Sequence, residues 1–140
     1  MVVRFVKTPG ARDRVYCERT DGSSASWSFP SYGPTGMPHD LVHFAVERAM
    51  GMTDGLFGKV AAGADLARIN AAANHTAGPV AESYADLAPL DQVLLSERLA
   101  AGDLDPVSEP DRARIQRERA ALFAAWRDLG DRGTLVLSWP

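Results

Sequence analysis

The hydrophobic pattern of this chain of 140 residues changes its period once, after a loop rich in Gly and Pro at residues 30–38. Before that loop, short runs of apolar residues alternate with polar ones, as in half-buried β-strands. The three predicted strands cover residues 2–7, 13–20 and 24–29. Asp21 and Gly22 join the last two in a hairpin, because both residue types tolerate positive φ. We therefore predict an antiparallel meander at the N-terminus.

From Pro38 onwards, the apolar residues recur at the helical period of three to four. Proline at the start of segments and glycine at their ends mark the helix boundaries. The predicted helices cover residues 38–50, 56–62, 65–73, 79–86, 89–102 and 108–130, and a last strand covers 134–139. The expected fold is α+β, with a small antiparallel sheet of three N-terminal strands and one C-terminal strand packed against several helices.

The length of the chain suits one ordinary domain and is too short for two, so we expect residues 1–140 to form a single domain. The lone Cys17 cannot form an internal disulfide, which fits the reducing cytoplasm. The first seven residues are too charged for a signal peptide, and no apolar run approaches the roughly 20 residues that cross a bilayer. We expect a cytoplasmic protein with no membrane partner.

The charge of the chain excludes general binding to nucleic acid. Asp and Glu outnumber Lys and Arg by 18 to 15, which gives a formal net charge of −3. Binding to duplexes depends on dense cationic contacts with phosphate. Lys7 and Lys59 are the only lysines among the cations, and this preference for Arg, with many Ala, favours a bacterial origin.

Two of the three histidines, His39 and His43, lie four residues apart in the predicted helix 38–50. Because each residue turns an α-helix by about 100°, the two imidazoles share one sector of this helix with Asp40 and Glu47. Two imidazoles one turn apart can direct nitrogens at a common point, and this spacing recurs in zinc sites. Asp40, beside the first histidine, is the candidate general base that takes a proton from metal-bound water.

A second interpretation of this sector is a solvated helix face, on which Asp40 in the first turn would only stabilise the helix dipole, or a set of core side chains whose hydrogen bonds are satisfied within the protein. The sector holds histidines and carboxylates without any Lys or Arg, which favours metal binding. Glu47 and His75 are alternative third ligands. Glu47 lies on the same helix face but is better placed to accept a hydrogen bond from a ligand histidine. His75 would have to fold back from a predicted loop.

A further pair of carboxylates, Glu82 and Asp86, stands on a later predicted helix, 39 residues after His43. The order His-Asp-x-x-His followed by Glu-x-x-x-Asp resembles the gluzincin type of zinc metallopeptidase, with Asp in place of the family's Glu. The resemblance implies zinc bound by His39, His43 and Glu82, Asp40 as general base and Asp86 as the partner of a ligand histidine. It also implies that the strand 24–29 aligns an extended peptide.

These observations predict a small metal-dependent hydrolase, peptidase-like, in which zinc-activated water attacks an amide or ester carbonyl of a peptide or small-molecule substrate. Two histidines and one carboxylate also suit non-haem iron, and we place zinc first because of the histidine spacing. The alternative is a non-catalytic interaction module. In that case the histidines form a structural metal site or none, and the long helix 108–130 binds a protein partner.

Overall fold

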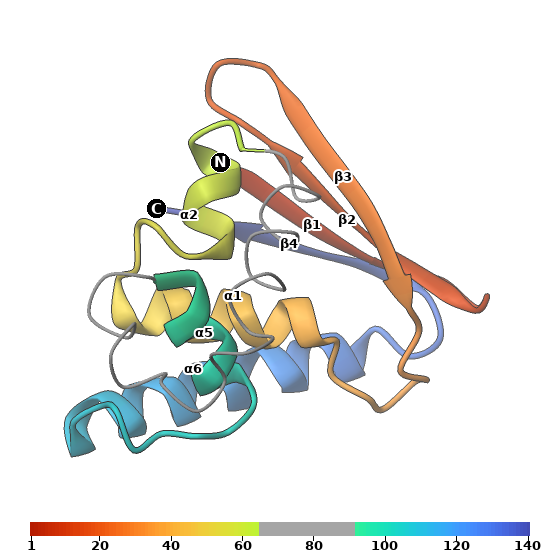
Figure 1. The fold of residues 1–140 in the computed structure, drawn as a ribbon. Helices are drawn as coiled ribbons and strands as arrows, with labels where there is room; N and C mark the ends of the chain where they lie inside the picture. Colours follow the sequence, from red (N-terminus) through yellow and green to blue (C-terminus); the bar gives the residue numbers. More distant parts are fainter. Residues whose placement is uncertain (65–91) are drawn as a thin grey trace, which may run out of the picture.

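The computed structural model describes residues 1–64 and 92–140, and these form a four-stranded antiparallel sheet with helices packed against it (Figure 1). The strands are β1 (Val2–Lys7), β2 (Arg12–Glu18), β3 (Ser24–Pro30) and β4 (Gly133–Ser138). Their order in the sheet is β3-β2-β1-β4, so the meander predicted for the N-terminus is followed at its β1 edge by the C-terminal strand. The predicted α+β fold and its strand composition are confirmed.

Four helices belong to the described part of the chain. They are α1 (His39–Met50), α2 (Leu56–Ala61), α5 (Gln92–Ala100) and α6 (Glu109–Asp128). The ends of these helices lie within two residues of the predicted boundaries. The predicted start of the helix 89–102 falls outside the described residues. The helices predicted for 65–73 and 79–86 also lie outside them. None of the described helices is long and apolar enough to cross a membrane.

The sheet buries one face against the helices, because its strands alternate strictly between inward and outward side chains. Phe5 on β1 and Val15 on β2 are fully buried on that face. Phe57 of α2 lies among aromatic rings, with ring centroids 6.0 Å from Phe5, 5.1 Å from Phe44 and 5.8 Å from Trp139. This aromatic core fixes the position of α1 and α2 relative to the sheet.

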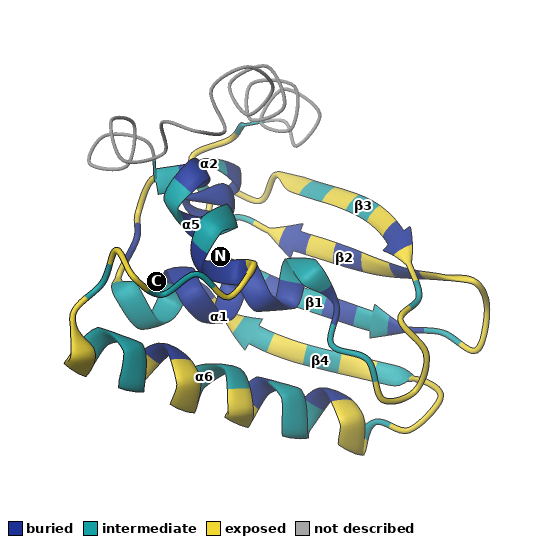
Figure 2. Ribbon diagram, turned by 60° about the horizontal axis from the view of Figure 1, so that its bottom comes forward, coloured by how far each residue is buried: buried dark blue, intermediate teal, exposed yellow. Residues whose placement is uncertain are grey.

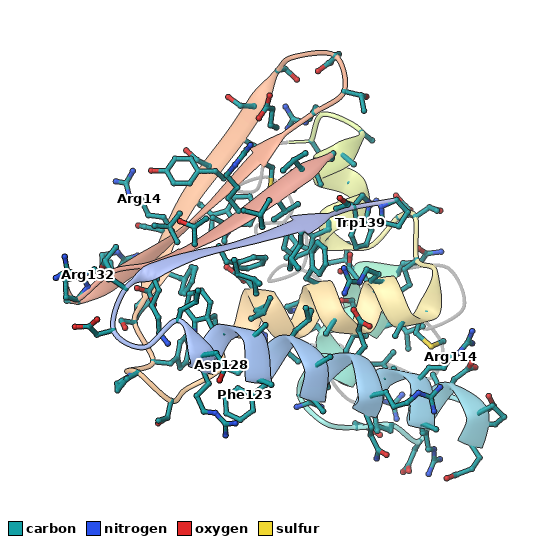
Figure 3. All side chains as sticks on the ribbon, turned by 180° about the vertical axis from the view of Figure 1, so that it is seen from behind. Arg14, Arg114, Phe123, Asp128, Arg132 and Trp139 are labelled. Carbon is teal, nitrogen blue, oxygen red and sulfur yellow. The ribbon has the colours of Figure 1, made fainter. Side chains whose placement is uncertain are left out.

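Helix α6 buries an apolar stripe against the core, and Phe123 lies outside this stripe. Ile115, Leu122 and Trp126 of α6 are buried, and Leu129 packs partly against the core. Phe123 lies one residue after Leu122 and therefore about 100° around the helix. Its ring is only half-buried and lies under the guanidinium of Arg127, on the outer side of α6 (Figure 3).

Helix α1 is the central helix of the molecule, because it packs against α2, α5 and α6. All residues from Leu41 to Glu47 are buried, whereas exposed positions recur along the whole length of α6 (Figure 2). The helix begins at His39, after Pro38 in an extended conformation, and ends at Gly51, which adopts a φ of 65°. Polar side chains in the middle of α1 must therefore find partners on the neighbouring helices.

Candidate metal centre

Helices α1 and α5 pack against each other (Figure 1). Three side chains from these two helices meet at this contact. His39 and His43 stand one turn apart on α1, and Glu97 reaches them from α5. The Nε2 atoms of the two histidines are 3.2 Å apart. One carboxylate oxygen of Glu97 lies 2.8 Å from His43 Nε2, and the other lies 3.2 Å from His39 Nε2.

These distances match those between neighbouring ligand atoms in a metal coordination shell. Zinc bonds of roughly 2.0–2.1 Å in tetrahedral geometry place neighbouring ligand atoms about 3.3 Å apart. The two imidazole rings stand nearly perpendicular, at 89°, and both direct Nε2 at the carboxylate. The group formed by His39, His43 and Glu97 could therefore hold a metal ion.

The three side chains differ in their exposure to solvent. The His43 side chain is only 5% exposed, whereas the side chains of His39 and Glu97 are 43% and 47% exposed. His43 is thus buried in the protein, whereas the other two side chains, His39 and Glu97, are partly exposed to solvent. Because three protein ligands leave a fourth position free in a tetrahedral site, water or a substrate would reach that position from the solvent side.

Behind the buried His43, a chain of hydrogen bonds leads to Glu47. His43 Nδ1 lies 2.6 Å from Ser96 Oγ, and Ser96 Oγ lies 2.7 Å from Glu47 Oε1. Glu47 also accepts hydrogen bonds from the backbone N–H groups of Leu56 and Phe57, at 2.7 and 2.9 Å. The carboxylate therefore satisfies orphan donors at the start of α2, which has no side-chain cap of its own.

Glu47 is completely buried, and this burial raises its pKa above the ordinary glutamate value, against the opposing effect of the hydrogen bonds from Ser96 and α2. This finding excludes the solvated-face interpretation for Glu47 and for His43, which is also buried. The predicted direct hydrogen bond from a histidine to Glu47 is not present, because His43 Nδ1 lies 3.9 Å from Glu47 Oε1 and Ser96 Oγ bridges the two groups.

Glu97 and His39 shift each other's titration in opposite directions. Hydrogen bonds from His39 and His43 hold the pKa of the Glu97 carboxyl well below its usual range. The hydrogen bond to Glu97 raises the pKa of the His39 imidazole above its ordinary value, although partial burial opposes this shift. In the metal-free protein the pair therefore favours a carboxylate beside a protonated imidazole.

Asp40, the predicted general base, has a different partner. Its Oδ2 accepts a hydrogen bond of 2.8 Å from Trp27 Nε1 of β3. The contact ties the first turn of α1 to the edge of the sheet, and Asp40 does not belong to the ligating group found among the described residues. Its role as a general base stays a prediction.

The remaining predicted site residues are Glu82, Asp86 and His75, and all three lie outside the described residues. Their roles as ligand, partner of a ligand and alternative ligand stay predictions. Glu97 and Ser96 were not identified from the sequence. Their only signal is a Ser-Glu pair directly after the apolar run 93–95 within a predicted helix.

Comparisons of the chain with models of protein families, with curated proteins and with solved structures find no match in any of the three.

Replacing Gly55 with Ala tests the contact between Glu47 and α2. A Cβ at this position would lie 2.5 Å from Glu47 Cδ and 2.7 Å from both carboxylate oxygens, although the φ of −77° suits any residue. We expect Gly55→Ala to lower the free energy of unfolding by about 1–3 kcal/mol, because a buried carboxylate must move. Urea unfolding measures this loss. Gly10→Ala is the control, since its Cβ would meet only Thr8 Oγ1 at 3.5 Å, and equal stability of the two variants would contradict the contact.

The ion pair predicts a pH dependence of stability in the metal-free protein. The stabilisation from His39 is fully present below the ordinary histidine pKa of 6.5 and is lost as the pH rises through its raised folded-state pKa. The stabilisation from Glu97 is fully present above the ordinary glutamate pKa of 4.5 and is lost as the pH falls toward its lowered folded-state pKa. The pair therefore stabilises most between pH 4.5 and 6.5.

Urea unfolding of the wild type and Glu97→Gln, in the presence of a chelator at a series of pH values, isolates this contribution. We expect the difference in the free energy of unfolding to peak in that window and to stay below about 1 kcal/mol, because both side chains are almost half exposed. A difference that does not vary with pH would contradict the pairing.

Proposed function

We propose that this chain is a small metal-dependent hydrolase that binds one zinc ion through His39, His43 and Glu97. The observation that carries the proposal is the convergence of two imidazole nitrogens and a carboxylate at separations of 2.8–3.2 Å on one side of α1. Two histidines and one glutamate, with a free fourth position, are a ligand set of catalytic zinc sites.

The choice between a catalytic and a structural metal rests on exposure. Structural zinc sites are closed by four protein ligands, whereas the described residues supply three here, of which two are almost half exposed. This open side supports a hydrolase over a non-catalytic module with a structural metal. The same ligand set also suits non-haem iron, which would redirect the chemistry toward oxygen.

A zinc ion held there would supply Lewis-acid chemistry, which activates water and polarises a carbonyl oxygen. The protein side chains would have complementary tasks. The buried His43 would fix the position of the site, while His39 and Glu97 would border the space that a substrate enters. An amide or ester carbonyl of a peptide or small molecule is the substrate class that this chemistry attacks. With this Lewis-acid chemistry supplied by the ion, the proposal would not require Asp40 as a base.

Elemental analysis of the purified untagged protein tests the proposed site through a matched pair of variants. We expect about one zinc per chain in the wild type and in Glu82→Ala, and loss of zinc in Glu97→Ala, because Glu97 contacts both imidazoles. Zinc retained in Glu97→Ala but lost in Glu82→Ala would contradict this ligand set and favour the predicted gluzincin arrangement. One iron per chain would be consistent with the same ligand set and would contradict the proposed zinc hydrolase.

Hydrolysis of chromogenic ester and peptide substrates then tests the activity. We expect it to disappear with a chelator, to return with zinc, and to be absent in His39→Ala, while circular dichroism shows that the chelated protein stays folded. A protein that unfolds on chelation and hydrolyses none of these substrates when loaded would support the structural alternative.

A further inference from the structure

We infer that Ser96 and Glu47 are positioning residues of the metal site, which hold His43 with its Nε2 lone pair directed at the ion. The inference rests on the proposed function, since it describes how the chain prepares one ligand for the metal. It assigns a role to the buried carboxylate that the ligand set leaves out.

The hydrogen-bond chain behind His43 has an arrangement of protons that leaves Nε2 free for a metal. The Ser96 hydroxyl donates to Glu47 Oε1 at 2.7 Å. The lone pairs of Ser96 Oγ are then the groups that face His43 Nδ1 at 2.6 Å. When a metal ion is bound at Nε2, the ring proton of His43 is on Nδ1, and the imidazole donates this proton to Ser96 Oγ.

The other side of the ring faces the remaining ligands. His43 Nε2 lies 2.8 Å from a carboxylate oxygen of Glu97 and 3.2 Å from His39 Nε2. Without a metal, this close contact with the carboxylate is a hydrogen bond, and an ion bound there would take the place of the bridging proton. The chain to Ser96 and Glu47 therefore fits the tautomer of His43 that metal binding requires.

Glu47 must be a carboxylate to complete the chain. Its Oε1 accepts from Ser96 and from the N–H of Leu56, and its Oε2 accepts from the N–H of Phe57. A glutamine would direct its NH2 group toward one of these donors. Ser96 is fully buried, so water cannot replace its hydroxyl.

Ser96→Ala tests the inference because it removes the hydroxyl and keeps a residue that favours a helix. We expect the zinc affinity, measured by competition with a chromophoric chelator at fixed pH, to fall about 10- to 100-fold. We also expect the visible absorption bands of the cobalt-substituted protein to shift, because the orientation of one imidazole changes. Neither readout depends on hydrolysis.

Ser108→Ala is the matched control, because Ser108 caps α6 by accepting from Asp111 N and makes no contact with the site. It should lower the melting temperature while leaving the zinc affinity within about twofold of the wild type. Glu47→Gln and the double variant Glu47→Gln/Ser96→Ala extend the test. If both residues act through one chain, the double variant should bind zinc no more weakly than the weaker single variant.

The outcomes separate this inference from the proposed function. Zinc binding by the wild type, with Ser96→Ala within twofold of it, would overturn the positioning role and leave the ligand set intact. A wild-type protein that binds no zinc would overturn the proposed function together with this inference. If Glu47→Gln does not fold, the comparison of Ser96→Ala with Ser108→Ala still decides.

Discussion

The buried carboxylate of Glu47 joins three helices around the candidate metal centre. It belongs to α1, it accepts the first backbone N–H groups of α2, and it accepts the hydroxyl of Ser96 on α5. Removing a carboxylate from water costs several kcal/mol unless its hydrogen bonds are replaced, and here every donor around it is supplied by the protein. The absence of a side chain at Gly55 leaves the space for this contact. Because α2 carries Phe57 into the aromatic core, the same carboxylate also connects the site to the sheet.

The arrangement gives the site two unlike sides. Behind His43, packing and hydrogen bonds fix one imidazole in a single orientation. In front of it, His39 and Glu97 stay half exposed, and in the metal-free protein they interact as an ion pair. Under the proposed function, metal binding replaces the proton shared within this pair by an ion of higher charge. A site that must hold an ion and also admit a substrate needs at least one rigidly held ligand and one side that is open to solvent.

Local sequence signals predicted most of the fold and only part of the site. Strand alternation, the Asp21-Gly22 turn and the boundaries at Pro38 and Gly51 are local features, and the elements that they predict are present. The histidine pair is also local, because a single helix places His39 beside His43.

Glu97 and Ser96 could not be identified in the same way, since their proximity to the histidines depends on how α5 packs against α1. The regular spacing of Glu82 and Asp86 resembled a known motif, whereas a lone Glu after an apolar run has no characteristic pattern. Phe123 shows the same limit on a smaller scale, because the apolar character of a residue does not reveal which side of α6 faces the core. The Glu47 chain needs three helices to be in place before its donors and acceptors meet.

A crystal structure of the zinc-loaded protein, with anomalous data on both sides of the zinc absorption edge, would identify the ligands of the ion. We expect one zinc peak between α1 and α5, about 2.0–2.2 Å from His39 Nε2, His43 Nε2 and a carboxylate oxygen of Glu97. A peak bound by other residues, such as Glu82 or His75 in place of Glu97, would contradict this ligand set, as would a zinc-soaked crystal without any peak at this position.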